Sequence, residues 1–248
     1  MKLTGKYAVV TGGASGIGLA LSRALQAHGA QVLAIGRDAA KLDAARKHGI
    51  GALSADVADG AERQRVIDTL LDAPTPIDIF INNAGTMQKF KLLDTDATAR
   101  TEAELELDLH APLHFCTALL DHLIRRPEAA IVNITTGLVY APYSGAPAYS
   151  AAKGGLQAFT KSLRWQTRHT GLKVVEVLPP AVDTDMTEGF EGLKIKPTTV
   201  ANAVVKALKR DRAEARVGPA KALYALSRLA PKAAFTMINR ELDTATGA

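Results

Sequence analysis

The chain of 248 residues has too few cysteines for a disulfide-stabilised protein, and its apolar runs are too short to span a membrane. Its single cysteine, Cys116, excludes an internal disulfide, and the apolar residues around it predict a buried thiol with no redox role. No apolar run approaches the roughly 18 residues that span a membrane, and the N-terminus begins a strand-like run at once, without a signal peptide. We therefore expect a cytoplasmic protein.

Aromatic residues are also scarce, at 5%, and none interleave with clustered basic residues. The net charge of +5 comes from lysines and arginines scattered among acidic residues, which is typical of a solvated surface, so we expect no nucleic-acid partner. Glu106, His110 and His114 recur at four-residue spacing, but no HExxH motif or third-ligand cluster accompanies them. This arrangement favours surface or structural histidines over a metal site.

The chain is rich in hydrophobic residues, at 47%, arranged in alternating strand-like and helix-like runs. This pattern predicts one domain over residues 1–248 with a doubly wound α/β Rossmann fold, whose sheet has about seven parallel strands. The strand-like runs are 7–11, 31–35, 52–55, 77–82, 130–135, 173–179 and 214–218. The helical runs are 16–27, 38–47, 60–71, 96–126, 149–168, 197–209 and 219–242, the last with a break expected at Pro231.

Two helical runs carry further signals. In the run 96–126, Thr101 and Glu104 have the spacing of a capping box, and Pro112 predicts a kink that leaves the carbonyl of Asp108 free. The run 219–242 mixes apolar and basic residues without a lipid anchor. It favours a helix that covers a substrate pocket or contacts a second subunit over one that lies on a membrane, and we expect no stable membrane insertion.

The stretch TGGASGIG, residues 11–18, follows the first strand-like run and leads into the first helix. Gly12, Gly16 and Gly18 let the backbone approach a pyrophosphate, and the helix N-terminus offers unpaired N–H groups to that charge. A flexible loop is the competing explanation. The position after the first strand of an α/β chain favours nucleotide binding.

A second motif lies within residues 131–153. Thr136 ends a strand-like run, and Tyr149 and Lys153 lie one turn apart on one face of a helix. An adjacent ammonium lowers the pKa of a phenol from about 10, so Tyr149 could act as a general acid or base. Thr135 is the competing hydroxyl, and only one of the two can face the site because successive strand residues point to opposite sides.

These motifs, together with Asn82-Asn83-Ala84-Gly85, resemble TGxxxGIG, YxxxK and NNAG of the short-chain dehydrogenase/reductase family, and the resemblance covers nearly the whole chain. HAPLHF, PPAVDTDM and LSRLAP look most like a bacterial branch of oxidoreductases named for an association with D-alanylation genes, a name that indicates no substrate. The resemblance implies that Tyr149 exchanges a proton with the substrate during hydride transfer. It also implies that Lys153 lowers the pKa of this tyrosine and holds the ribose, and that Thr136, in place of serine, polarises the carbonyl.

The resemblance further implies a set of cofactor-binding residues. They are Gly12, Ala14, Ser15, Gly16, Ile17, Gly18, Arg37, Asp56, Val57, Asn83, Ala84, Gly85, Tyr149, Lys153, Pro179, Val182 and Thr184. Arg37 follows the second strand-like run, where NAD enzymes usually carry an acidic residue, and its forked donors suit the 2′-phosphate of NADP(H). Asp38 is the competing residue, but it is better explained as a helix cap.

The chain departs from the family pattern at Asp108, since DLHAP stands where the pattern is roughly NLxAP. The family's asparagine is associated with a relay water held by its backbone carbonyl, and that role could survive the change. A carboxylate near Lys153 would, however, compete with Tyr149 for the lysine charge.

The substrate is expected to contact side chains that follow the fourth, fifth and sixth strand-like runs, which are mostly apolar. The candidates are Met87, Leu138, Tyr140, Tyr143, Val182, Met186 and Phe190. Glycines 189 and 192 mark residues 184–196 as a lid over cofactor and substrate. The resemblance implies a homodimer or homotetramer packed through helices around 101–126 and 149–168.

Together these features predict an NADP(H)-dependent oxidoreductase that interconverts a carbonyl and an alcohol on a mostly apolar small molecule. The alternative is a nucleotide-sensing binding protein with weak or no catalysis, which Asp108 and Thr136 favour and which the intact Tyr149 and Lys153 oppose. A sugar-nucleotide epimerase is disfavoured, because only about 30 residues follow the last strand-like run.

Overall fold

A computed structural model describes the backbone of residues 1–245 and the side chains of residues 1–240. At its centre lies a seven-stranded sheet in the order β3-β2-β1-β4-β5-β6-β7, in which every neighbouring pair is parallel. The strands are β1 (Tyr7–Thr11), β2 (Gln31–Gly36), β3 (Gly51–Ser54), β4 (Ile79–Asn82), β5 (Ala129–Ile134), β6 (Leu172–Leu178) and β7 (Glu214–Arg216). The chain runs outward from β1 to β3 and then from β4 to β7 on the other side, which confirms the predicted doubly wound fold.

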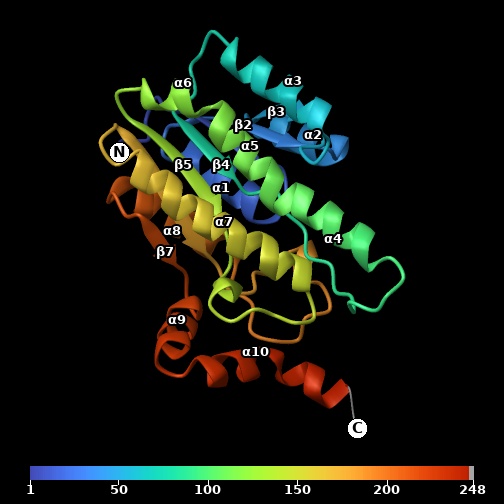
Figure 1. The fold of residues 1–248 in the computed structure, drawn as a ribbon. Coiled ribbons are helices and arrows are strands. Elements are labelled where there is room, and N and C mark those ends of the chain that lie inside the picture. Colours follow the sequence, from blue (N-terminus) through green and yellow to red (C-terminus); the bar gives the residue numbers. More distant parts are fainter. Residues whose placement is uncertain (246–248) are drawn as a thin grey trace.

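Helices cover both faces of this sheet (Figure 1). They are α1 (Gly16–Ala27), α2 (Ala39–Lys47), α3 (Gly60–Leu71), α4 (Ala97–Leu105), α5 (Ala111–Ala118), α6 (Leu120–Ile124), α7 (Pro147–Gln166), α8 (Pro197–Lys209), α9 (Ala220–Leu229) and α10 (Pro231–Ala245). Residues of α1, α2 and α8 join one apolar core, and residues of α3, α5, α6 and α7 join the other. All six residues of β5 are buried, because this central strand is covered on both faces.

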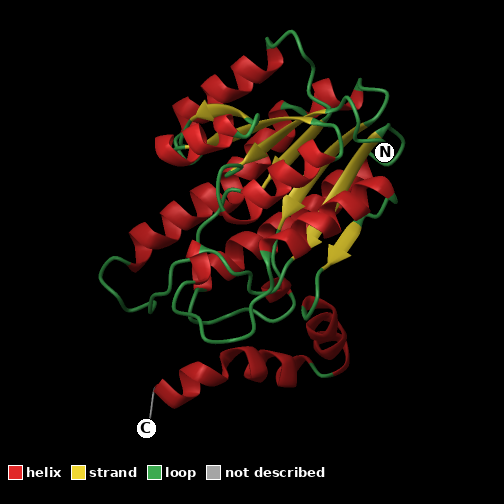
Figure 2. Cartoon of the chain, turned by 180° about the vertical axis from the view of Figure 1, so that it is seen from behind, coloured by secondary structure: helices red, strands yellow, loops and turns green. Residues whose placement is uncertain are grey.

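The last two helices lie beyond the end of the sheet toward which the strand arrows point (Figure 2). The predicted break at Pro231 is confirmed, since α9 ends at Leu229 and α10 begins at the proline. The side chain of Asn239 joins α10 to the loop before α7, donating to the carbonyl of Pro142 at 2.9 Å and accepting from the N–H of Ser144 at 2.6 Å. Among the described helices, none is long and apolar enough to cross a membrane.

The helical run 96–126 is interrupted, as Pro112 predicted, but by more than a kink at the proline. A π-helical turn, η1 (Glu106–His110), follows α4, and a second break at Leu119 separates α5 from α6. The π turn closes where the N–H of Ala111 donates to the carbonyl of Glu106, just before Pro112, which has no N–H to donate. The interruption therefore begins several residues before the proline that signals it.

The predicted capping box is also wrong. Helix α4 already begins at Ala97, so Thr101 lies inside it and its hydroxyl donates to the carbonyl of Ala97 at 2.8 Å. Glu104 instead accepts from the N–H of Gln88 at 2.9 Å. Likewise, Tyr149 does not open its helix, because α7 starts at Pro147, whose fixed φ suits the first turn.

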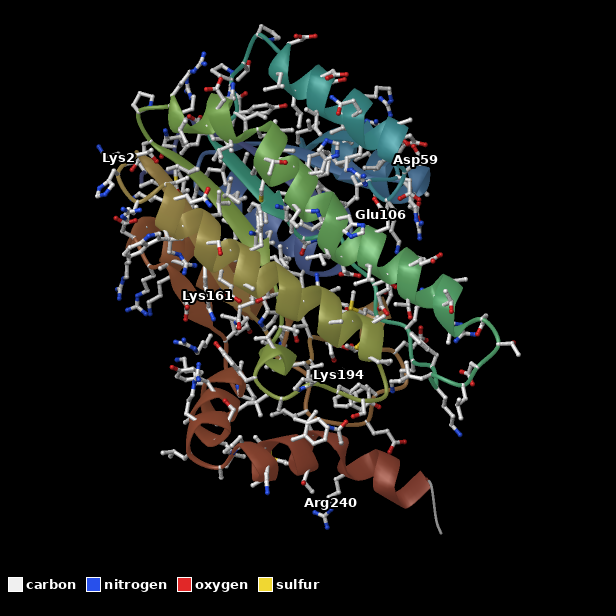
Figure 3. The ribbon with its side chains drawn as sticks, viewed as in Figure 1. Lys2, Asp59, Glu106, Lys161, Lys194 and Arg240 are labelled. Atoms are coloured by element: carbon white, nitrogen blue, oxygen red, sulfur yellow. The ribbon has the colours of Figure 1, made fainter. Side chains whose placement is uncertain are left out.

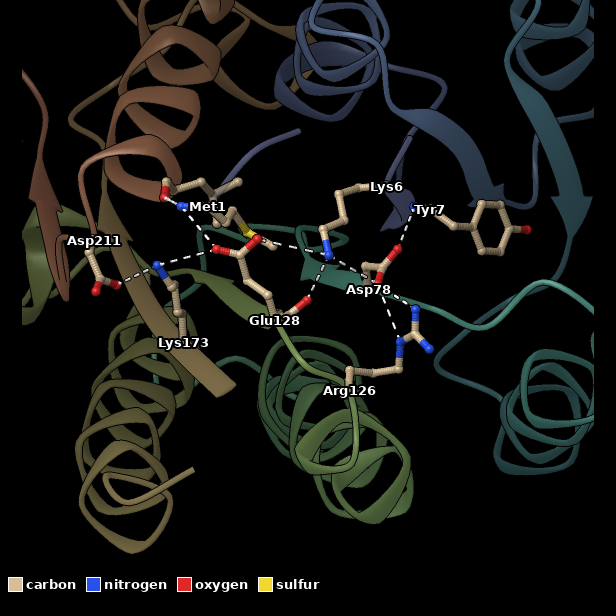
Figure 4. Close-up of polar contacts among 9 residues, drawn as sticks. Met1, Lys6, Tyr7, Asp78, Arg126, Glu128, Lys173 and Asp211 are labelled. Carbon is tan, nitrogen blue, oxygen red and sulfur yellow. Dashed lines mark hydrogen bonds and ion pairs between the residues drawn. The ribbon is translucent and has the colours of Figure 1, made fainter. Parts of the chain in front are cut away.

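At the amino-terminal edge of the sheet, Asp78 connects β1, β4 and the turn before β5 (Figure 4). Its carboxylate accepts from the N–H of Tyr7 at 3.0 Å, from Arg126 at 2.9 Å and from Lys6 at 3.4 Å. Burial opposes ionisation of Asp78, but the Tyr7 N–H and the two cations outweigh it and lower the pKa of the carboxyl.

Replacing Asp78 with asparagine should reduce the free energy of unfolding at neutral pH by about 2 kcal/mol, the scale of hydrogen bonds lost from a charged group. Because the folded pKa is lowered, this stability is present above the unfolded pKa of 3.8 and is lost as the pH falls through the folded value. Urea unfolding at neutral and acidic pH measures both effects. Asp121→Asn, which removes an exposed pair with Arg125, is the control and should cost less than about 0.5 kcal/mol. Equal losses for the two variants would contradict the argument.

Candidate active site

The two predicted loops meet at the carboxyl ends of the central strands β1 and β4. The hydroxyl of Thr11 accepts from the N–H groups of Asn83 at 2.9 Å and Ala84 at 3.0 Å. The side-chain amide of Asn83 donates in turn to the carbonyl of Thr11 at 2.9 Å. The TGGASGIG loop and the NNAG segment are thus joined at the point where the strand order reverses, the place where open α/β sheets bind ligands.

The glycines of the first loop are required by its shape. Gly12 has a φ of +63°, and a Cβ added to Gly18 would lie only 2.0 Å from the carbonyl oxygen of Gly12. Ser15 caps helix α1 by position, but its side chain makes no capping hydrogen bond. No side chain in the described part of the chain caps the first N–H groups of this 12-residue helix, which leaves them available to an anionic group such as a pyrophosphate.

The predicted lid begins against this loop. A Cβ on Gly16 would lie 3.1 Å from Thr184, which precedes the short 3₁₀ turn η3 (Asp185–Thr187). Asp185 forms an ion pair with Lys41 of α2 at 2.9 Å. Residues 14–16, Lys41 and Asp185 are among those that line a cavity of about 330 Å³. Whether the segment opens and closes stays a prediction.

The two polar residues expected near the adenosine end of a nucleotide lie together. Arg37 contacts Asp56 at 3.0 Å, and its side chain is 76% exposed, so its donors are accessible to a ligand. The predicted cap at Asp38 is confirmed, because its carboxylate accepts from the N–H of Lys41 at 3.0 Å. Lys41, in the first turn of α2, is a cation that sequence reasoning missed, and it lines the cavity beside the glycine loop.

Helix α7 carries Tyr149 and Lys153 into the interior, where Asp108 of the π turn meets them. The ammonium of Lys153 lies 2.7 Å from Oδ1 of Asp108, donates to the carbonyl of Ile134 at 3.3 Å, and lies 5.8 Å from the ring centroid of Tyr149. The other oxygen of Asp108 accepts from the N–H of Thr86 at 3.0 Å. Asp108, Lys153 and Tyr149 are all buried, so the sequence prediction that the carboxylate lies near the lysine is correct in geometry.

Gly85 leaves the room that this ion pair occupies. A Cβ at this position would lie 2.4 Å from Oδ1 of Asp108 and 3.3 Å from the ammonium of Lys153. Any side chain here would therefore displace the buried pair. This close packing explains why the last position of NNAG is a glycine.

The two neighbouring hydroxyls at the end of β5 are separated by the alternation of the strand. Thr135 donates to a buried carboxylate oxygen of Glu176 at 2.9 Å. Thr136 is the hydroxyl beside Tyr149, where its hydrogen bond favours the phenolate. It also accepts from the N–H of Leu138 at 3.3 Å, at the start of the 3₁₀ turn η2 (Gly137–Val139). The structure thus selects Thr136 over Thr135 as the hydroxyl at the site.

The charges of the site hold Tyr149 in its protonated form. Burial raises the pKa of Tyr149 above its usual value; the positive charge of Lys153 opposes this, and the negative charges of Asp108 and Glu104 reinforce it. Burial alone would lower the pKa of Lys153, but Asp108 and Tyr149 raise it, so the lysine stays charged. The lowered tyrosine pKa expected from the sequence is therefore not found in this structure, because burial of the phenol outweighs the charge of Lys153 and the charge of Asp108 adds to the effect of burial.

Glu104 is a buried acidic residue of the site. Sequence reasoning interpreted it only as part of a capping box. Its side chain is 0% exposed, and it lies on α4 one turn before Asp108. Burial raises its pKa to about 7, and the charge of Asp108 adds to this, whereas the Gln88 N–H and Lys153 oppose it. The four-residue spacing from Asp108 was the available signal, but the capping-box interpretation concealed it.

The residues predicted to contact the substrate, and the remaining predicted cofactor contacts, differ in burial and location. Met87, Leu138, Tyr143 and Phe190 are half-buried and Met186 is exposed, so their contact with a substrate stays a prediction. Tyr140 is engaged elsewhere: its hydroxyl accepts from Arg216 at 2.9 Å and its ring packs on Tyr224. Of the remaining predicted cofactor contacts, Ile17 lies in the first turn of α1, and Val57, Pro179 and Val182 lie in the loops that follow β3 and β6.

The residues considered as metal ligands make polar contacts with one another and with Arg63. Arg63 of α3 contacts Glu106 at 2.8 Å and donates to Nδ1 of His114 at 3.0 Å, and Glu106 also contacts His110 at 2.9 Å. Cys116 is buried as predicted, and burial raises the pKa of its thiol to about 12.

Comparison with known proteins decides the family. The family model described as short chain dehydrogenase matches residues 6–192. The chain belongs to the short-chain dehydrogenase family. It is therefore an oxidoreductase of the family that acts on alcohols and carbonyls with NAD(P).

Among the relatives of this short-chain dehydrogenase is the uncharacterized oxidoreductase DltE of Bacillus subtilis, 35% identical over 191 residues that cover 76% of each chain. An uncharacterized oxidoreductase of Staphylococcus epidermidis is 32% identical over 84% of this chain and 92% of its own length. A short chain dehydrogenase from Burkholderia cenocepacia, solved in complex with NADP, matches the fold at a TM-score of 0.86 and 24% identity, over 96% of this chain and 99% of its own. One from Streptomyces avermitilis matches 99% of this chain and all of its own at a TM-score of 0.82 and 25% identity.

Gly18→Ala should weaken nucleotide binding and lower thermal stability, because the added Cβ would meet backbone oxygen at 2.0 Å. The expected loss of stability is about 1 to 3 kcal/mol, the scale of overpacking in a well-packed region. Gly154→Ala is the matched control, since a Cβ there meets nothing within 4 Å and the position is helical. It should be neutral or stabilising by up to about 1 kcal/mol. Thermal melts and nucleotide titration give the answer; a Gly18→Ala protein that matches Gly154→Ala in both would show that the loop is not close-packed.

Proposed function

We propose that this short-chain dehydrogenase uses NADP(H) to interconvert a carbonyl and an alcohol on a mostly apolar small molecule. The observation that carries the proposal is the buried group of Tyr149, Lys153 and Thr136 next to a loop with free helical N–H groups. The glycine loop fits a pyrophosphate, because its positive φ and the close approach of Gly12 and Gly18 leave backbone rather than side chains facing the ligand. The nicotinamide of the bound cofactor would supply or accept the hydride.

Side chains of the protein would carry out and support the proton transfer. Tyr149 would donate its proton to the carbonyl oxygen during reduction and accept one during oxidation. Thr136 would hydrogen-bond the same oxygen and fix its position. Lys153, held by Asp108 and the carbonyl of Ile134, would supply the positive charge that stabilises the phenolate after transfer.

Preference for NADP(H) over NAD(H) would come from Arg37. Its guanidinium is exposed and is held by one contact to Asp56, so it can turn to pair with a 2′-phosphate. Asp38, the residue that would disfavour that phosphate, is engaged as the cap of α2. The oxidoreductase is further proposed to be a homodimer or homotetramer packed through its long helices, where Trp165 of α7 is 68% exposed.

The alternative function is nucleotide sensing with weak or no catalysis. The observation in its favour is the pKa of Tyr149, which burial and the charges of Asp108 and Glu104 raise in the absence of bound groups. The two functions differ in turnover rather than in nucleotide binding, so a panel of ketones and aldehydes followed by NADPH absorbance distinguishes them.

Tyr149→Phe should abolish turnover of any carbonyl that the protein reduces, by at least about a hundredfold, because it removes the proton donor. Affinity for NADPH should stay nearly unchanged, since the phenol is proposed to serve proton transfer. Tyr7→Phe is the control, because Tyr7 begins β1 at the opposite end of the sheet. Unchanged turnover in Tyr149→Phe would refute the proposed role of this residue.

Arg37→Ala should weaken NADPH binding by about 1 to 3 kcal/mol, the scale of a lost charge-assisted hydrogen bond, and should change NADH binding little. Arg46→Ala removes another exposed arginine of α2, which pairs with Asp43, and should affect neither nucleotide. Titration of both nucleotides against both variants tests the assignment. Similar losses for NADPH and NADH in Arg37→Ala would mean that this side chain does not recognise the phosphate.

A further inference from the structure

The carboxylate of Glu104 is placed where a buried charge has little compensation. One oxygen accepts from the backbone N–H of Gln88 at 2.9 Å, and the backbone N–H of Tyr149 also favours the ionised form, but Oε2 has no partner within hydrogen-bond geometry in the described part of the chain. The side chain is fully buried. An ionised carboxylate in this position would keep an unpaired oxygen away from water, which is costly.

The groups around Glu104 come from three segments. The π turn contributes Asp108, helix α7 contributes Lys153 and Tyr149, and the loop after β4 contributes the Gln88 N–H. Lys153 is the only cation among these neighbours, and Asp108 already contacts it at 2.7 Å. A second negative charge here is therefore poorly balanced, and the protonated form of Glu104 is favoured.

We propose that Glu104 is a positioning residue for Tyr149 that acts through its charge, so that its protonation state controls how readily the phenol ionises. This inference rests on the proposed function, because Tyr149 is its target as general acid and base. Glu104 need not touch the substrate.

The coupling follows from electrostatics. While Glu104 is protonated, the buried site holds one ammonium and one carboxylate, and a phenolate adds the first unbalanced charge. Once Glu104 ionises, the phenolate would be a second unbalanced negative charge, so the pKa of Tyr149 rises. With the pKa of Glu104 at about 7, this switch falls near neutral pH.

A structural role for Glu104 makes a different prediction. The carboxylate links the loop at Gln88 to a helix that packs on α7, and that link alone would position Tyr149 by shape. Glu104→Gln separates the two roles, because glutamine keeps the size and the acceptor oxygen and removes the ionisable group. Glu106→Gln is the matched control two residues later, because Glu106, labelled in Figure 3, is partly exposed and pairs with Arg63 of α3.

The test is an NMR titration of the full chain with tyrosine labelled with ¹³C at Cζ. The Tyr149 resonance is assigned as the one that is absent from the spectrum of Tyr149→Phe. In the wild type and in Glu106→Gln, the Tyr149 signal should shift with a midpoint near pH 7. In Glu104→Gln this inflection should vanish. In Asp108→Asn it should move to lower pH, because Glu104 loses a like-charged neighbour. An inflection that survives in Glu104→Gln, or its absence from the wild type, would overturn the proposal.

Turnover supplies the second readout once a reducible carbonyl is found. The limb of the kcat/KM profile assigned to Tyr149 should lie at lower pH in Glu104→Gln than in wild type, by about 0.5 unit or more, and Glu106→Gln should not move it. A Glu104→Gln protein with lower activity and an unmoved limb would show a purely structural role. If no carbonyl of the panel is reduced, the proposed NADPH-dependent carbonyl reduction fails, and the tyrosine resonance still decides whether Glu104 and Tyr149 are coupled.

Discussion

The buried ion pair between Asp108 and Lys153 is the interaction on which the site depends. A pair removed from water is costly unless further hydrogen bonds satisfy both partners. Here the Thr86 N–H donates to one carboxylate oxygen, the Ile134 carbonyl accepts from the ammonium, and Gly85 leaves the space that the pair requires. The pair thereby joins the loop after β4, the π turn, the end of β5 and helix α7 around one point.

Much of this arrangement could be predicted from the sequence, because its signals are local. Apolar runs alternating with helical patterns specify the parallel sheet, and the glycine loop is recognisable from its place after β1. The spacing of Tyr149 and Lys153 places them on one helix face whatever surrounds them. The Asp38 cap was also predictable, since it depends only on the first turn of α2.

The remainder depends on contacts between distant segments. Nothing in the helical period of residues 96–126 distinguishes a π turn from a regular helix, and Pro112 indicates a break only near its own position. Glu104 has the spacing of a capping partner, but Asp96 precedes an earlier start of α4 and the Gln88 loop supplies its actual donor. The pKa of Tyr149 likewise depends on two carboxylates whose distance from it no local pattern reveals.

The replacement of the family's asparagine by Asp108 changes the charge of the site rather than its shape. An aspartate adds a negative charge that the lysine must balance, so the lysine has less charge to offer a phenolate. A neighbouring carboxyl that stays protonated, as Glu104 does below its pKa of about 7, keeps the buried group of Glu104, Asp108, Lys153 and Tyr149 electrically neutral. This neutrality explains how the chain tolerates two carboxyl groups and one ammonium out of water, since only one of the carboxyl groups is then ionised. It also means that either further ionisation, of Glu104 or of Tyr149, makes the other harder.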